Sequence, residues 1–182
     1  MKGLMIFADG FEDVEGIATV DILKRAQIKL TCVTLKNKKE VTTSAQNHLV
    51  FEQSLADVDY KTFDFLILPG GPAVFNELDK SKKVDEVVNY FCTNQKLVCA
   101  ICAAPLLIGK HGYFENLDYT CFPGCNEKIY LGNKVDDGVV HSKNFITAKS
   151  MYYACDFALE IVSTIKGNDK AISVAKQIKG ME

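Results

Sequence analysis

The chain has 182 residues, enough for one compact domain with a hydrophobic core, and we expect residues 1–182 to form a single domain. Hydrophobic residues make up 48% and charged residues 24% of it, and the formal net charge of −2 provides no basic field to attract nucleic acid or an anionic membrane surface. No stretch approaches the ~20 apolar residues that cross a membrane, and the apolar run at the N-terminus is too short for a signal peptide, so we expect a cytoplasmic protein.

The first half of the chain alternates short apolar runs with amphipathic segments. Residues 4–8, 30–35 and 65–68 are continuous apolar or β-branched runs, the pattern of strands buried in a parallel sheet. Between the first two runs, residues 15–27 carry apolar side chains three residues apart, which predicts a helix. Residues 41–53 are mixed and rich in threonine, which indicates an edge strand or a hairpin.

The second half continues the same alternation. Val84, Val87, Val88 and Phe91 recur at helical spacing, and Leu97–Ile101 is the next core strand. The later elements that we expect are a helix over 103–110, a short strand over 119–122, a hairpin within 139–147 and a last long helix that includes 158–165.

Strands that alternate with helices predict an α/β fold, a mostly parallel sheet with helices on both faces. In such sheets ligands bind beyond the carboxyl ends of the strands. This rule selects three loops as candidate site elements, at residues 9–15, 69–72 and 102–105.

The most informative segment runs from Leu97 to Pro105, where a buried strand passes directly into a predicted helix. Ala100, Ala103 and Ala104 are the small neighbours that such a sharp turn needs, and the pattern is that of a nucleophile elbow with Cys102 at its apex. At a helix N-terminus the helix dipole and free amide groups favour a thiolate, so we expect a lowered pKa for Cys102. The alternative is a buried core cysteine.

The other two loops add complementary groups. Gly70 and Gly71 end the third core strand, and the amides of Gly71 and Ala103 are candidates for an oxyanion hole. The first loop is acidic and would bind a phosphate poorly, which argues against a flavodoxin. Glu15, at the start of the first predicted helix, is the candidate for a carboxylate beside the thiol.

Three motifs together resemble a known family. Gly10–Glu15 (GFEDVE), Leu68–Gly71 (LPGG) and Ala100–Pro105 (AICAAP) occur in the order found in the ThiJ/PfpI superfamily, within the branch of the parkinsonism-associated protein deglycase and its bacterial relatives. The resemblance covers nearly the whole chain. It implies a flavodoxin-like three-layer sandwich, similar to class I glutamine amidotransferases, and a homodimer.

The resemblance also implies chemistry. Cys102 would be the oxidation-sensitive nucleophile, and Glu15 would contact it as a protonated carboxyl or a proton shuttle. The function it implies is cofactor-independent and metal-independent processing of a small aldehyde or glycated substrate, of the glyoxalase III or protein deglycase type. The alternative is a non-enzymatic oxidative-stress sensor or redox chaperone that acts through oxidation of Cys102.

Some positions depart from the family pattern. Ala103 stands where the family's peptidases carry histidine, so peptidase activity is disfavoured, and Phe122 stands where many members have histidine before a proline. The loop that is commonly Ser-Arg-Gly-Pro-Gly reads Ala148–Tyr152 here, which makes Met151 a bulky pocket residue. Gly70, Cys121 and Phe122 complete the predicted pocket.

The 7 cysteines and 3 histidines are candidates for metal ligands, for a redox pair and for part of a catalytic triad. Cys99, Cys102, Cys121 and Cys125 are numerous enough for zinc, but residues three apart in a strand point to opposite faces, so we expect no metal site. Cys121 is either a buried small residue or a resolving thiol for oxidised Cys102. The histidines, at 48, 111 and 141, are expected at the surface, so no Cys-His-acid triad is predicted.

Overall fold

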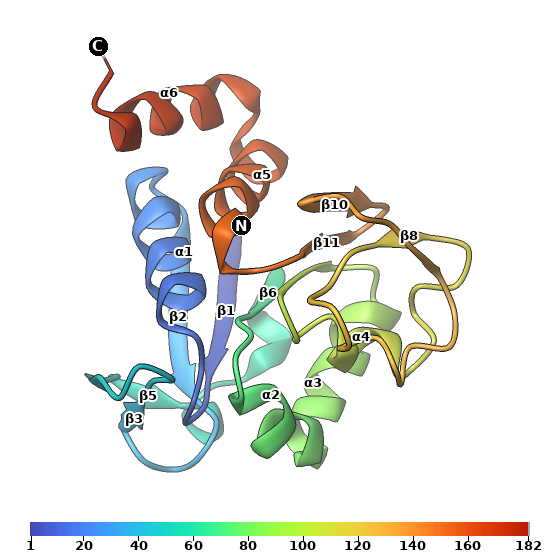
Figure 1. The fold of residues 1–182 in the computed structure, drawn as a ribbon. Coiled ribbons are helices and arrows are strands. Elements are labelled where there is room, and N and C mark those ends of the chain that lie inside the picture. The colour runs from blue at the N-terminus through green and yellow to red at the C-terminus, as the bar shows by residue number, and fades with distance from the viewer. Residues whose placement is uncertain (182) are drawn as a thin grey trace.

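The computed structural model describes residues 1–181, and within them seven strands form one sheet in the order β10-β11-β7-β6-β1-β2-β5 (Figure 1). All neighbouring strands are parallel except β10 and β11, which form an antiparallel hairpin. In chain order the strands of this sheet are β1 (Lys2–Phe7), β2 (Lys29–Thr34), β5 (Gln53–Ser54), β6 (Phe65–Leu68), β7 (Leu97–Ile101), β10 (Val139–Ser142) and β11 (Phe145–Ala148).

Helices cover both faces of this sheet, as an α/β sandwich requires. Their bounds are α1 (Asp13–Arg25), α2 (Ala73–Asn76), α3 (Lys82–Thr93), α4 (Leu106–Gly109), α5 (Ala154–Lys166) and α6 (Asn168–Lys179). Helix α1 packs against α5, whereas α3 packs on β6 and β7 from the side that also carries α4 (Figure 1). None of the helices found in residues 1–181 combines the length and apolar character needed to span a bilayer.

The central strands owe their position to continuous apolar sequence. Strands β6 and β7 are buried at every residue, and β1 is exposed only at Lys2. Both faces of these strands are covered, so an uninterrupted apolar run is the pattern they require. Their carboxyl ends lead into the loops at residues 8–12, 69–72 and 102–105, which therefore meet at one edge of the sheet.

The predicted α/β sandwich is confirmed, and so are the hairpins. Residues 41–53 contain the hairpin of β3 (Glu40–Thr42) and β4 (His48–Val50), which forms a separate small sheet, followed by the edge strand β5. The predicted hairpin within 139–147 is the β10–β11 pair.

Three predicted elements differ from the structure. The helix expected over 103–110 is only α4, because the residues before it form tight four-residue turns. In one of them the N–H of Leu106 bonds to the carbonyl of Ala103, three residues back. The strand expected over 119–122 is β8 (Asp118–Tyr119), which pairs with β9 (Asn133–Lys134) outside the main sheet. The last long helix is two helices, since Gly167 adopts a positive φ of +91° between α5 and α6.

Gly3 makes room for the ring of Phe65 on the neighbouring strand. The two residues are paired across β1 and β6, and a Cβ at Gly3 would lie 2.1 Å from the Phe65 ring. Phe65 is fully buried, so its ring has no open space into which to move.

We therefore predict that Gly3→Ala lowers the free energy of unfolding by about 1–3 kcal/mol, the usual cost of overpacking a core. Urea unfolding of Gly3→Ala, Phe65→Leu and the double variant measures the effect. A smaller side chain at position 65 should relieve part of the clash, so the double variant should lose less stability than the two single variants summed. Strict additivity would contradict this packing argument.

Candidate active site

Cys102 lies at the apex of a sharp turn between β7 and α4. Its φ is +63°, a left-handed conformation that non-glycine residues seldom adopt. Three backbone hydrogen bonds hold the turn. The Cys102 N–H donates to the Ala148 carbonyl (2.8 Å), the Cys102 carbonyl accepts from the Phe122 N–H (2.9 Å), and the Ala104 N–H donates to the Ile101 carbonyl (3.0 Å). A strained residue held this firmly is typical of functional sites.

Glu15 lies beside that thiol and is fully buried. It belongs to the first turn of α1, and its Oε2 accepts a hydrogen bond from the N–H of Gly70 at 2.9 Å. Its other oxygen, Oε1, has no hydrogen-bond partner in the part of the chain that the structure describes. A buried carboxyl oxygen without a hydrogen-bond partner is costly to stability.

Burial raises the pKa of Glu15 to about 7, against the opposing effects of the Cys102 thiol and the Gly70 N–H. Burial likewise raises the pKa of Cys102, and the adjacent Glu15 carboxylate raises it further, whereas the Gly71 N–H lowers it. Each acid disfavours a second negative charge beside it, so the two titrate as a pair. The pair is therefore neutral well below pH 7, and above pH 7 it carries one negative charge, on Glu15, while the thiol keeps its proton.

The pKa of Cys102 is raised, so the expectation of a lowered pKa for this thiol is wrong. The predicted helix dipole is missing at Cys102 because α4 begins only at Leu106 and has four residues. The nearest charge is instead a carboxylate, which opposes ionisation of the thiol.

Two glycines allow the loops to approach one another. A Cβ at Gly70 would lie 2.6 Å from Oε2 of Glu15 and 2.7 Å from Cβ of Cys102, so a side chain there would separate the pair. Gly71 has a φ of +89°, and a Cβ on it would lie 2.6 Å from the backbone N of Glu12. The backbone turn at these residues directs the Gly71 N–H at the Cys102 sulfur.

The thiol opens into a cavity of about 300 Å³. The residues that line it are Gly71, Pro72, Phe75, Asn76, Cys102, Ala103, Phe122 and Cys125. Most of these side chains are apolar, which favours a small, weakly polar ligand.

The sequence-predicted pocket is present only in part. Phe122 lines the cavity, together with Gly71 and Ala103, while Gly70 lies behind it against Glu15. Cys121 is fully buried and outside the lining, and the side chain of Met151 is exposed to solvent away from it. The structure adds Phe75, Asn76 and Cys125; the Pro123-Gly124 turn signal beside Cys125 was the one available sequence clue.

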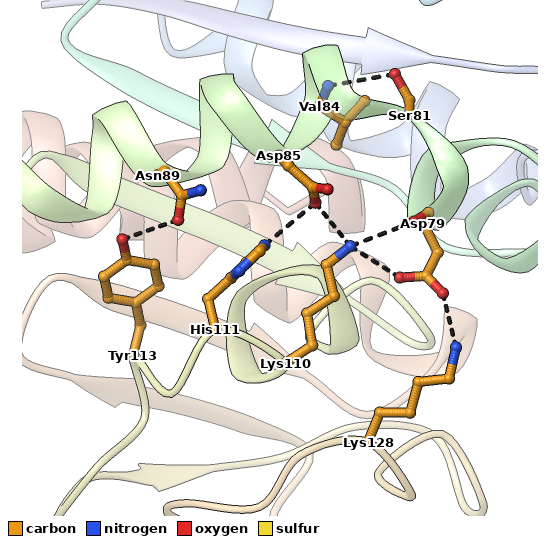
Figure 2. A network of polar contacts seen from close by, with 9 residues as sticks. All are labelled: Asp79, Ser81, Val84, Asp85, Asn89, Lys110, His111, Tyr113 and Lys128. Carbon is orange, nitrogen blue, oxygen red and sulfur yellow. Dashed lines mark hydrogen bonds and ion pairs between the residues drawn. The ribbon is translucent and has the colours of Figure 1, made fainter.

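The three histidines lie away from the cavity, each paired with a carboxylate. His48 contacts Glu40 (2.8 Å) and His141 contacts Glu160 (2.8 Å). His111 contacts Asp85 (3.1 Å) at the edge of a polar network between α3 and the turn after α4 (Figure 2). The three histidines are exposed, as predicted, and none of them lines the cavity beside Cys102.

A metal-binding arrangement is also not found. No group of three or more histidine, cysteine, aspartate or glutamate side chains in residues 1–181 is placed to hold an ion. All seven cysteines are free thiols.

Comparison with known proteins reveals related sequences and structures. Residues 1–164 match the model of the DJ-1/PfpI family. The protein dj-1beta of Drosophila melanogaster is 34% identical over 177 residues, which cover 96% of this chain and 95% of the fly protein. The glutathione-independent glyoxalase DJR-1.2 of Caenorhabditis elegans is 32% identical over 169 residues, covering 92% of this chain and 89% of the worm protein.

Solved structures of related proteins share the fold of this chain. The crystal structure of Drosophila melanogaster DJ-1beta has a TM-score of 0.89 to this chain at 33% identity and covers 98% of both chains. Oxidised Toxoplasma gondii DJ-1 has a TM-score of 0.90 at 21% identity and covers 97% of both, which shows the shared fold.

The raised pKa of Glu15 predicts a pH-dependent stability. The folded state retains the Glu15 proton up to about pH 7, whereas the ordinary carboxyl value is 4.5. The stability tied to this proton is thus complete below pH 4.5 and is lost as the pH rises to about 7. Glu15→Gln, which mimics the neutral acid, should match wild type at pH 4.5 and exceed its stability above pH 7 by about 3 kcal/mol.

Urea unfolding of both proteins across this pH range measures the difference. Glu115→Gln is the matched control, because Glu115 is exposed and its substitution should leave the pH profile unchanged. A constant difference between wild type and Glu15→Gln from pH 4.5 to pH 8 would mean that folding does not raise the pKa of Glu15.

Proposed function

The chain belongs to the DJ-1/PfpI family, and on this premise we propose that it is a cysteine-dependent, cofactor-independent enzyme that converts small reactive aldehydes to hydroxy acids. The observation that carries the proposal is the Cys102–Glu15 pair, in which a thiol that lines a small apolar cavity lies beside a buried carboxyl with a pKa of about 7. A relative of 32% identity, named a glutathione-independent glyoxalase, supports the same class of reaction.

In the first step the Cys102 sulfur attacks the aldehyde carbon of a 2-oxoaldehyde. The Glu15 carboxylate accepts the thiol proton as the carbon–sulfur bond forms, which supplies the activation that the raised pKa of Cys102 makes necessary. The N–H of Gly71 points at this site, and the N–H of Ala103 has no acceptor among residues 1–181, so both can stabilise the resulting oxyanion. Glu15 then returns its proton to that oxygen, which gives a hemithioacetal.

In the second step Glu15 acts again as a base. The carboxylate removes the hydrogen of the former aldehyde carbon as a proton and delivers it to the neighbouring carbonyl carbon. The hydroxyl proton on the first carbon passes to the oxygen of the second, so the first carbon becomes the thioester carbonyl and the second carries the hydroxyl of a 2-hydroxy acid. Water then hydrolyses the thioester and frees Cys102. One carbon is oxidised while its neighbour is reduced, so the overall reaction is redox-neutral.

The cavity restricts the substrate. A volume of about 300 Å³ lined by Pro72, Phe75 and Phe122 suits a compact aldehyde with an apolar substituent, such as methylglyoxal. Among the lining residues only Asn76 has a polar side chain other than a thiol, and it can orient the substrate's second oxygen.

A redox sensor is the second candidate. Cys102 is accessible through the cavity, and Glu15 in its neutral form can donate a hydrogen bond to an oxidised sulfur. A sensor is modified once per chain, whereas a catalyst turns over, which separates the two functions experimentally.

We predict many turnovers of lactate production from methylglyoxal by wild type and none above background by Cys102→Ser. Glu15→Gln should lower kcat/KM by about 10²-fold or more, the usual contribution of a general base. Cys155→Ser is the matched control, because Cys155 is exposed and does not line the cavity. Turnover at the wild-type rate in Glu15→Gln would contradict the proton-shuttle role, and product limited to one per chain in wild type would favour the sensor.

A further inference from the structure

Two thiols open into the same cavity. Cys102 and Cys125 both line it, and each is partly accessible. A charge on Cys125 raises the pKa of Cys102, and the Glu15 carboxylate raises the pKa of Cys125, so the three groups lie near one another. Cys121, which adjoins Phe122, is fully buried. The cavity thus contains a second sulfur that the aldehyde chemistry does not use.

A tight turn places Cys125 there. The Cys125 N–H donates to the Phe122 carbonyl at 3.0 Å, and Pro123 and Gly124 occupy the two central positions. Gly124 has a φ of +81°, so these residues form a turn of type II, in which proline precedes a glycine of positive φ. The chain reverses at this turn, and Phe122 and Cys125 at its two ends both line the cavity.

The turn is tied to the catalytic elbow at one end and to the body of the protein at the other. The Phe122 N–H bonds directly to the Cys102 carbonyl at 2.9 Å. Three residues beyond Cys125, the Lys128 ammonium pairs with Asp79 at 2.9 Å, within the network of Figure 2. Between these anchors the turn itself is open, since no described atom would lie within 4 Å of a Cβ on Gly124.

We propose that Cys125 is a resolving cysteine, which forms a reversible disulfide with Cys102 when a hydroperoxide oxidises the nucleophile. The disulfide spans the cavity, so it closes the aldehyde site and protects Cys102 from irreversible oxidation. The inference rests on the reactivity of Cys102 that the proposed function also requires.

The reaction balances in two steps. The Cys102 sulfur, deprotonated by Glu15, attacks one peroxide oxygen, the O–O bond breaks, and the departing oxygen takes the proton from Glu15 to leave as water or an alcohol. The Cys125 sulfur then attacks the sulfenic sulfur of Cys102, the S–O bond breaks, and hydroxide leaves with the Cys125 proton as water. The two thiols supply the two electrons that reduce the peroxide, and an external dithiol reverses the disulfide.

The other cysteines are poorly placed for this role. Cys99, which lies within β7, is fully buried, and Cys121 is fully buried as well. Neither Cys99 nor Cys121 lines the cavity into which Cys102 opens, where its sulfenic acid would form.

Peptide mapping tests the proposal. Wild type is treated with a small excess of hydrogen peroxide, alkylated, and digested with trypsin without reduction. The expected product joins peptide 97–110, which contains Cys99 and Cys102, to peptide 111–128, which contains Cys121 and Cys125. Fragmentation of the joined peptides should locate the bond at Cys102 and Cys125, and dithiothreitol should restore both thiols.

Cysteine-to-alanine variants assign the bond independently. The joined peptide should persist in Cys99→Ala and Cys121→Ala, the matched controls, and be lost in Cys125→Ala. In Cys125→Ala the same peroxide dose should instead leave Cys102 as a sulfinic acid that dithiothreitol does not reverse. Sulfinic acid on Cys102 with a free Cys125 thiol in wild type, or a bond that disappears in Cys121→Ala, would overturn the proposal.

The same experiment separates this inference from the proposed function. A disulfide in a protein that produces no lactate would reject the enzyme and leave the redox pair standing. Lactate production with sulfinic acid and a free Cys125 would reject the redox pair alone. A Cys102 that reacts with neither peroxide nor iodoacetamide would reject both.

Discussion

The site depends on one constraint, the burial of a carboxyl group against a thiol. Two acids in contact in a region of low polarity cannot both ionise, so Glu15 and Cys102 are limited to about one negative charge near neutral pH. The backbone is arranged around this contact, because Gly70 has no side chain to separate the two groups and donates its N–H to Glu15. The pair thereby retains a proton that can move during reaction.

The fold supplies the rigidity that this contact needs. Strands β1, β6 and β7 end side by side in a fully buried layer, and their loops bring residues from distant parts of the sequence together. The left-handed backbone of Cys102 costs of order 1 kcal/mol, which the hydrogen bonds to Ala148 and Phe122 help to offset. The stability lost at Glu15 and Cys102 is thus compensated by the core beneath them.

Much of this was predictable from sequence because it depends on local patterns. Continuous apolar runs indicated the buried strands, small residues around Cys102 indicated the elbow, and the three motifs identified the family. The lining by Phe75 and Cys125 was not predictable, since it depends on the short helix α2 and on a turn docked from another part of the chain. The prediction of a lowered pKa for Cys102 was wrong for a related reason. Burial and the contact with Glu15 are tertiary effects, and they outweigh the effect of the local motif on the pKa.

The lack of a nearby histidine gives Glu15 more than one task. In the proposed reaction a single carboxyl must first accept the thiol proton, then protonate the oxyanion, and finally move a hydrogen between two carbons, which requires a pKa close to the working pH. Burial provides that value, about 7. The protonation state that favours attack on an aldehyde also favours attack on a peroxide, since both begin with transfer of the Cys102 proton to Glu15. Aldehyde chemistry and oxidation therefore compete for the same reactive state, and a second thiol in the cavity would make the oxidative outcome reversible.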